Sequence, residues 1–378
     1  MVSKPDSGRP TLRDVSSLTG LSVYSVSRAL SGQKGVSEET RLRVQAAARE
    51  VGYVANQLAR SLKGNSSRTI GILAGGTANQ YYATLIGAFD QALRAANFQS
   101  VLADTMADGA YGRQRESHMV SALLEQRVAA IVVTYSLAPA NLKLITEWKI
   151  PLIFVDCVPP KQYAQYPAVA CDNEQASRMV GDHFAGHGYR HWAFVGYPKR
   201  WSSRLPRERA FLESAQRHGA TVDVIDTGND PVTPYEKMSR YLAEHRPGTV
   251  DAIYCTNTPL LQGTLRAIRD DGRRVGTDIG VIAFDEFEWA SLLQPSITVI
   301  DQHTPDIGRH AAAKLLDAVA DGPDADGVRL PNAELISPAL IVRQSCGCHL
   351  PTAGDSPGSA AAAPHPGEGR QDHDHNAH

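Results

Sequence analysis

The sequence predicts a small all-helical head containing a helix-turn-helix, followed by an α/β body of two doubly wound parallel-sheet subdomains. Three observations support this prediction. At 378 residues the chain exceeds the usual size of one domain. The head holds closely spaced helical patterns, and from Thr69 short apolar strands alternate with helices. This alternation implies right-handed crossovers and parallel sheets, and its units are too many for one sheet.

In the head, Thr11 and Asp14 fit a capping box at the start of a first helix, which Gly20 ends. Ser22 caps a second helix, and a third spans Glu38–Val51. Two helices joined by a three- or four-residue turn with a glycine form the helix-turn-helix pattern.

A short helical stretch, Asn56–Lys63, follows the head. Its eight residues are too few for a stable isolated helix in water, so we expect a hinge that is ordered only in some states. The predicted divisions are the head at 1–54, the hinge and linker at 55–68, the body at 69–349 and a disordered tail at 350–378. The tail has almost no large apolar residues to offset its ordering entropy.

The body has a regular order of elements. The predicted strands are Ile70–Ala74, Ser100–Asp104, Ala129–Thr134, Leu152–Asp156, Trp192–Gly196, Thr221–Asp226, Ala252–Thr256 and Gly280–Phe284. The predicted helices lie near Tyr81–Asn97, Arg113–Gln126, Glu174–Gly186, Arg207–His218, Tyr235–His245 and Leu260–Asp271. A late helix, Asp306–Asp321, should return to the first subdomain. Subdomain N would then be 69–168 plus 301–328, and subdomain C 169–300 plus 329–349.

Composition narrows the function. Residues 1–66 carry ten Lys and Arg against five Asp and Glu, a net +5, whereas the whole chain carries −2, which leaves −7 for the rest. A basic head on an acidic body indicates a polyanion partner for the head, although basic helices also occur without one. The sequence has no membrane-length apolar run and no signal peptide, so we expect a cytoplasmic protein without a membrane partner. The five cysteines show no disulfide spacing, and the sequence contains no enzyme motif.

The segments TLRDVSSLTGLSVYSVSRALSG and VSEETRLRVQAAAREVGYVANQLARSLKGNSSRTIGIL closely resemble the head and hinge of the LacI/GalR family of bacterial transcriptional regulators. The resemblance continues to roughly Cys346. It implies a nucleoid-associated, non-enzymatic regulator without a cofactor, which binds a palindromic operator in double-stranded DNA as a homodimer. It also implies that the body dimerises and, like a periplasmic sugar-binding protein, holds a small-molecule effector in the cleft between its subdomains.

The family motif makes Val23, Tyr24 and Arg28 candidate base-readers on the recognition helix. A major-groove helix faces base edges with its N-terminal part, where Arg28 could bond guanine and Val23 could pack on a thymine methyl. Alternatively, Val23 is core and Arg28 contacts a phosphate. The nearby serines are interpreted as caps or phosphate contacts: Ser22, Ser25, Ser27 and Ser31.

Leu62 matches the hinge leucine of the family, and the nearby Asn56 also belongs to this DNA-binding hinge. An apolar side chain wedged into a minor-groove base step bends the duplex. Leu58 and Leu62 could instead be an ordinary apolar stripe.

The resemblance also implies a set of effector-binding residues in the cleft. They are Tyr81, Tyr82, Asp156, Trp201, Ser203, Arg207, Asn257 and Asp285. Most follow the carboxyl ends of predicted strands, where open α/β sheets bind ligands. Carboxylates accept from adjacent sugar hydroxyls, an arginine donates as a fork, and aromatic faces suit a sugar ring. As structural alternatives, Asp285 could cap a turn and Arg207 could pair with Glu208 or Glu213.

Several features leave the effector open between a sugar, a sugar acid and a sugar phosphate. Thr258 follows Asn257 where many relatives have an aspartate, and Asn229 stands where several have a stacking aromatic. The loop 199–204 is unusually cationic, which would suit an anion, or would be a solvated loop. Release by an inducer and tightening by a co-repressor are both possible within the family.

The run Cys346-Gly347-Cys348-His349 and the His-rich tail could bind a soft metal. Because only one pair of thiols is present, we expect no metal site beyond adventitious binding by the tail. These residues suggest one rival function, a metal-responsive regulator, and the cleft suggests another, a solute-binding protein without a role on DNA.

Overall fold

The computed structural model describes residues 10–31, 35–54, 67–77, 79–106, 111–321 and 333–348. The expected hinge helix Asn56–Lys63 and the tail at 350–378 lie outside these residues. The head contains α1 (Leu12–Thr19), α2 (Val23–Leu30) and α3 (Glu38–Val51), with the predicted bounds. The Asp14 carboxylate accepts from the Thr11 amide at 2.6 Å, and Gly20 ends α1 in the left-handed region at φ 69°.

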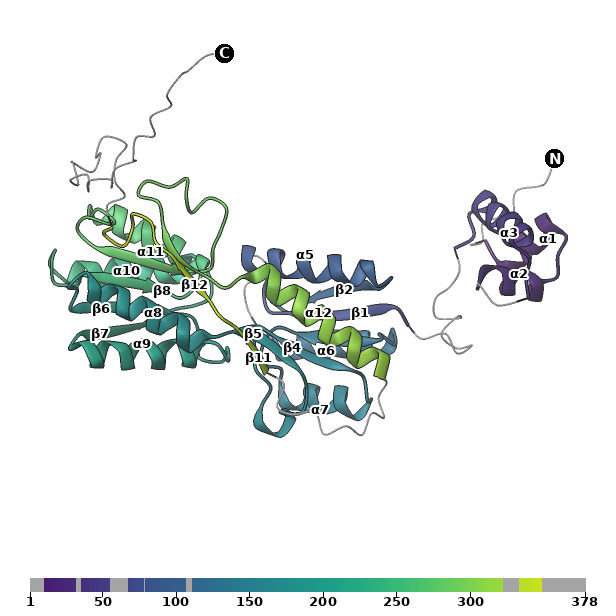
Figure 1. Ribbon diagram of the computed structural model, residues 1–378, viewed down its shortest axis with the longest axis horizontal. Coiled ribbons are helices and arrows are strands. Elements are labelled where there is room, and N and C mark those ends of the chain that lie inside the picture. The colour runs from purple at the N-terminus through teal and green to yellow at the C-terminus, as the bar shows by residue number, and fades with distance from the viewer. Residues whose placement is uncertain are drawn as a thin grey trace, which may run out of the picture.

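The body consists of two lobes, each built on a six-stranded sheet (Figure 1). The first sheet is parallel and has the order β11-β5-β4-β3-β1-β2. Its strands are β1 (Thr69–Ala74), β2 (Gln99–Asp104), β3 (Ala130–Val133), β4 (Leu152–Val155), β5 (Ala168–Cys171) and β11 (Ala333–Ile336). The second sheet has the order β12-β10-β9-β8-β6-β7 and is parallel except for the pair β10–β12. Its strands are β6 (His191–Gly196), β7 (Thr221–Asp226), β8 (Ala252–Cys255), β9 (Gly280–Phe284), β10 (Thr298–Asp301) and β12 (Ala339–Ile341).

Helices cover both faces of each sheet, which confirms the predicted doubly wound class. The first lobe holds α5 (Gln80–Ala95), α6 (Arg113–Glu125), α7 (Pro139–Glu147), the 3-10 turn η1 (Lys161–Tyr163) and α12 (Thr304–Asp321). The second lobe holds α8 (Asn173–Gly186), α9 (Arg204–His218), α10 (Val232–Glu244) and α11 (Thr258–Asp270). Among the described helices, none is both long enough and apolar enough to cross a membrane.

The division between the lobes differs from the predicted one in two places. β5 and β11 pair with each other in the first sheet, whereas we had assigned 169–300 and 329–349 to subdomain C. The chain leaves that sheet after β5, returns to it for β11, and then enters the second sheet again, where β12 pairs with β10. Short strands such as these show no periodicity that a sequence pattern could detect, and their partners lie far away in the chain.

Candidate functional site

Helix α2 presents its first residues to solvent. Val23 and Tyr24 are 41% and 70% exposed, whereas Val26 is fully buried in the core of the head. Val23 is therefore not a core residue, which removes one alternative to base contact. The half-buried Arg28 lies beside Tyr24, with its guanidinium carbon 5.7 Å from the ring centre. Within two turns of α2, the helix thus offers an apolar, an aromatic and a cationic group.

The serines of this region have different local roles. The Ser22 hydroxyl accepts from the Ser25 amide at 3.1 Å and so caps α2. The Ser31 hydroxyl donates to the Arg28 carbonyl at 3.2 Å, and Ser27 is half-buried. The hinge candidates Asn56 and Leu62 lie outside the described residues.

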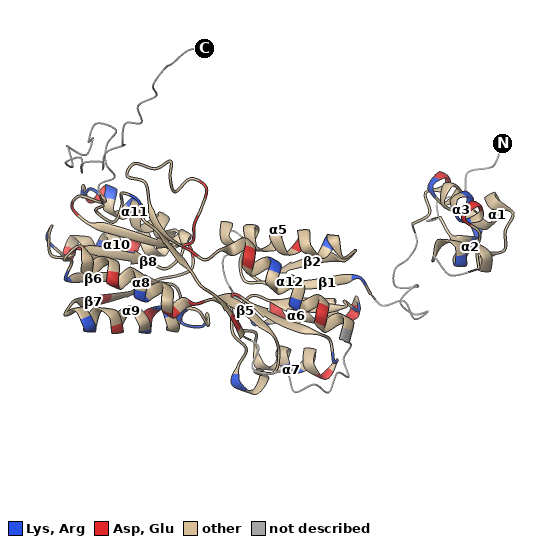
Figure 2. Ribbon diagram, viewed as in Figure 1, with Lys and Arg blue, Asp and Glu red and all other residues tan. Residues whose placement is uncertain are grey.

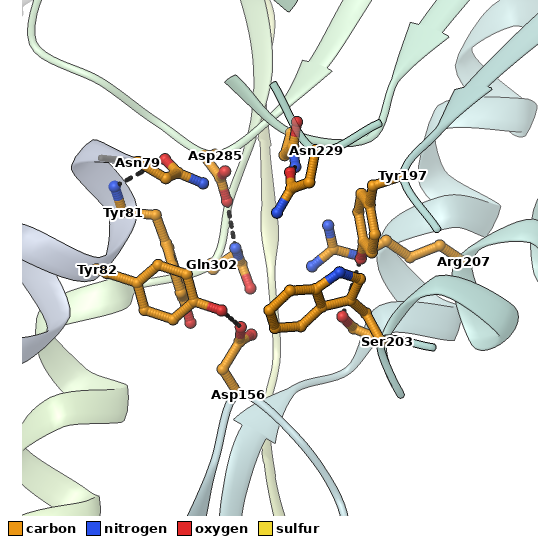
Figure 3. Close-up of a pocket in the computed structure, with 12 residues that line it drawn as sticks. Asn79, Tyr81, Tyr82, Asp156, Tyr197, Ser203, Arg207, Asn229, Asp285 and Gln302 are labelled. Carbon is orange, nitrogen blue, oxygen red and sulfur yellow. Dashed lines mark hydrogen bonds between the residues drawn. The ribbon is translucent and has the colours of Figure 1, made fainter. Parts of the chain in front are cut away.

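A polar pocket lies between the two lobes, at the carboxyl ends of strands from both sheets (Figure 3). It brings together all eight residues that the resemblance implied. Its lining is Asn79, Tyr81, Tyr82, Asp156, Tyr197, Trp201, Ser203, Arg207, Asn229, Asn257, Asp285 and Gln302. The open space at its centre is about 30 Å³, roughly the share of one water molecule in the liquid. In this conformation the pocket is therefore too small for a sugar-sized molecule.

Arg207 is the only cationic side chain in this lining. It projects from α9 and is almost fully buried, and its Nε donates to Asn173 Oδ1 at 2.7 Å. A terminal nitrogen donates to the Thr256 carbonyl at 2.6 Å, and the guanidinium stacks 3.3 Å above the Phe284 ring. The alternative pairings are not formed, because Glu208 and Glu213 pair with other basic residues of the same region. Arg207 is therefore held rigidly, with its guanidinium pointing toward the pocket (Figure 3).

Two carboxyl groups face this arginine from the ends of β4 and β9. Asp156 and Asp285 have φ values of 61° and 81°, in a left-handed region that costs a non-glycine residue about 1–3 kcal/mol and is concentrated at functional sites. Burial raises the pKa of the Asp156 carboxyl to about 7, against the opposing effect of Arg207 and with a further increase from Asp285. Burial raises the pKa of Asp285 as well.

Some acceptor atoms of the pocket have no partner among the described residues. Tyr82 donates to one oxygen of Asp156 at 3.2 Å, but the other oxygen, Oδ1, is buried without a hydrogen bond. Gln302 donates to Asp285, while its own Oε1 is also buried without a partner. Unpaired buried acceptors are costly, so each calls for a donor from a ligand or water.

Other lining residues are held by local bonds. The Asn257 oxygen caps α11 by accepting from the Leu260 amide at 3.0 Å, and its nitrogen donates to Asn229 at 2.7 Å. Ser203 shares a 2.9 Å hydrogen bond with Tyr197. Asn229, which stands where several relatives have a stacking aromatic, thus supports another amide.

The three cationic side chains of the loop 199–204 are absent from the pocket lining, although Trp201 and Ser203 of the same loop belong to it. Arg204 is fully buried and donates to the Tyr197 carbonyl at 2.9 Å and to Asp226 at 2.7 Å. Lys199 lies 3.6 Å from Glu208, and Arg200 stacks on Tyr111 at 3.5 Å. Lys199 and Arg200 are exposed and Arg204 is buried, and none of the three belongs to the pocket lining, so their charges do not form an anion site in the cleft.

Sequence reasoning missed Asn79, Tyr197 and Gln302. Tyr197 directly follows a predicted strand, so its position at the carboxyl end was available as a signal. Asn79 caps α5 by accepting from the Tyr81 amide at 3.1 Å. Gln302 follows β10, which we did not predict.

Sequence reasoning also missed the surroundings of Cys346 and Cys348. The structure brings both thiols next to His183 and His187 of α8. The spacing of these histidines, four residues apart at the end of a predicted helix, was a visible signal. His349 and the tail lie outside the described residues.

The fold and site define a class of protein: a helix-turn-helix head joined to a two-lobed α/β body with a polar pocket between the lobes. Residues 11–56 match the family model for bacterial regulatory proteins of the lacI family, and residues 181–346 match that of the periplasmic binding protein-like domain. The chain is 30% identical over 347 residues to the HTH-type transcriptional regulator PtxS of Pseudomonas aeruginosa, covering 90% of this chain and 97% of that protein. This chain therefore belongs to the LacI family, as predicted, and is a DNA-binding transcriptional regulator rather than an enzyme.

Other relatives agree. The HTH-type transcriptional repressor PurR of Pectobacterium carotovorum is 28% identical over 343 residues, covering 89% of this chain and 96% of that protein. In fold, the chain is similar to the lac repressor dimer bound to operator and the anti-inducer ONPF, with a TM-score of 0.74, 23% identity and coverage of 90% and 99%. It is also similar to the transcriptional regulator CelR–cellobiose complex, with a TM-score of 0.65, 24% identity and coverage of 89% and 100%.

Proposed function

We propose that this chain is a transcriptional repressor that binds a palindromic operator as a homodimer and is released by a sugar-like effector bound between its lobes. It would work in the cytoplasm, on the bacterial chromosome. The observation that carries the proposal is the convergence of Arg207, Asp156 and Asp285 in one buried pocket. The names of the relatives PurR and PtxS, and the cellobiose held by CelR, support the same function.

The chemistry of the lining favours a neutral polyol. Asp156 Oδ1 and Gln302 Oε1 offer unpaired acceptors, and Arg207 offers a guanidinium, so together they complement hydroxyl groups, which both donate and accept. The two carboxyl groups outnumber the single cation, and Lys199, Arg200 and Arg204 do not line the pocket. A sugar is therefore favoured over a sugar acid or a sugar phosphate.

The position of the pocket explains the control. A ligand between two lobes changes their relative orientation, and β1, which follows the hinge, belongs to the first lobe. Reorientation would therefore move the two hinge starts of the dimer relative to one another. Typical coupling between such sites is about 1–3 kcal/mol, or about 5- to 150-fold in affinity.

The head supplies sequence recognition. The exposed Val23 and Tyr24, with Arg28 beside them, would meet base edges in the major groove, while Ser22 and Ser27 position the helix on the backbone. From the family motif, Leu62 would be the minor-groove wedge, with Asn56 in the same hinge.

The decisive experiment is an operator gel shift with and without each member of a panel of sugars, sugar acids and sugar phosphates. We expect one neutral sugar to weaken operator binding in the gel shift. The same sugar should raise the melting temperature of the protein in a thermal unfolding assay. A sugar that tightens binding would establish the co-repressor direction. The proposal is wrong if no compound changes operator binding. It is also wrong if the active compound changes operator binding by Arg207→Ala as much as it does for the wild type.

A further inference from the structure

Two histidines and two cysteines meet at the end of α8, far from the pocket lining. His183 and His187 lie one turn apart on this helix, and 161 residues separate His187 from Cys348. The Nε2 atom of His187 lies 3.2 Å from His183 Nε2 and 3.1 Å from Cys348 Sγ. Cys348 Sγ lies 3.9 Å from His183 Nε2. With Cys346 included, all four ligand atoms lie within 4.8 Å of one another.

The separations of 3.1, 3.2 and 3.9 Å are close to those of a tetrahedral zinc site, and the widest one, within 4.8 Å, would have to shorten by about 1 Å when an ion binds. Zn–N bonds of about 2.0–2.1 Å and Zn–S bonds of about 2.3 Å place ligand atoms about 3.3–3.8 Å apart. Two thiolates and two imidazoles are also one of the standard ligand sets of structural zinc. Two imidazole nitrogens facing each other at 3.2 Å repel unless a proton or a cation lies between them.

The surroundings hold the ligands in place. Thr298 Oγ1 donates to Cys346 Sγ at 3.1 Å, and the Tyr189 ring stacks on His187 with centroids 5.4 Å apart. Gly347 has φ 94°, a conformation that suits glycine and that lets the sulfurs on either side approach α8. Partners of this kind orient metal ligands and are part of most metal sites.

We propose that His183, His187, Cys346 and Cys348 form a Zn²⁺ site that ties the end of the body to α8. Cys346 is fully buried, whereas the other three side chains are partly exposed, so one side of the site faces solvent. An ion can therefore enter from solvent and be bound by a buried thiolate. We had predicted no such site, since the sequence shows only one pair of thiols.

The test uses the full chain, freed of metal by a chelator under reducing conditions and titrated with Co²⁺. Tetrahedral Co²⁺ with thiolate ligands gives intense visible bands and a sulfur-to-metal charge-transfer band. We expect both to saturate at about one ion per chain, Zn²⁺ to displace them, and Zn²⁺ to raise the melting temperature. Cys348→Ser and His187→Gln should each weaken Zn²⁺ binding, measured by chelator competition, at least about tenfold.

The matched control replaces His373, His375 and His378 of the tail by alanine in the full chain, which should leave the charge-transfer band unchanged. Circular dichroism of Cys348→Ser, whose side chain is only half-buried, checks that the variant folds. The proposal is overturned if no charge-transfer band forms, if folded Cys348→Ser binds Zn²⁺ as tightly as the wild type and gives a charge-transfer band of the same intensity, or if the tail variant abolishes the band.

Discussion

The Trp201 ring lies directly against Gly75, so closely that a Cβ on Gly75 would be well inside van der Waals contact with the ring. Gly75 follows β1 in the first lobe, and Trp201 follows β6 in the second. The same ring meets Tyr135 of the first lobe edge-on, with centroids 5.8 Å apart. The missing side chain of Gly75 therefore makes room for a contact that holds the two lobes together beside the pocket.

We expect Gly75→Ala to displace Trp201 and favour separated lobes. If the effector binds between closed lobes, its affinity should fall about 2- to 10-fold, since one aromatic contact contributes about 0.5–1.5 kcal/mol. Isothermal titration calorimetry measures the affinity, and small-angle scattering measures the opening. Gly87→Ala is the matched control, because nothing lies within 4 Å of a Cβ at that helical position. If Gly75→Ala has the effector affinity and the scattering profile of the wild type, the contact between Trp201 and Gly75 does not oppose separation of the lobes.

Asp285→Ala and Arg207→Ala should each abolish the effect of the ligand on operator binding while leaving ligand-free binding near normal. A ligand shifts an equilibrium only through its differential affinity for the two states, so the loss of its contacts removes the shift. For an inducer, these variants would repress permanently. Arg209→Ala, on the same helix with its side chain 61% exposed, is the control. Gel shifts that still respond at the wild-type ligand concentration would place the effector elsewhere.

Asp156 should make the stability of the ligand-free protein depend on pH. Its folded pKa of about 7 lies above the usual value of 3.8, so the folded state holds its proton more tightly than the unfolded state does. Stability from this group is therefore fully present below about pH 4 and lost as pH rises through 7. The loss is up to about 4 kcal/mol. Asp156→Asn should remove this pH-dependent part of the free energy of unfolding. Denaturant unfolding curves of both proteins between pH 4 and 8 measure it. Parallel curves would contradict the raised pKa.

Arg28→Ala should weaken operator binding and relax the preference at one base pair by about 1–3 kcal/mol. Tyr24→Ala should likewise change base preference, because the exposed ring lies on the surface of α2 that would meet the bases. Arg49→Ala, at the end of α3, is a control for lost charge. Binding assays over operator variants decide the matter. An equal loss on every variant would make Arg28 a phosphate contact.

Local sequence patterns determined the elements and the kind of protein. Capping residues determined where the helices of the head begin and end, because each acts within one turn of its helix. Ser22 and Ser37 are N-caps, and Gly20 and Gly52 are C-caps. Charge was less informative in the body, where Figure 2 shows acidic and basic residues interspersed along the helices. The pocket residues followed from motif positions at strand ends, which parallel sheets place along one edge.

Tertiary structure decided whatever depends on contacts between distant segments. The short edge strand β11 forms by pairing with β5, more than 160 residues away in the chain, and both strands carry little pattern of their own. Likewise, Gln302 reaches Asp285, Trp201 reaches Gly75, and the thiols after β12 reach the histidines of α8 only once both sheets have formed. Caps and periodicity depend on a few neighbouring residues, whereas these contacts join residues that lie far apart in the chain and meet only in the folded structure.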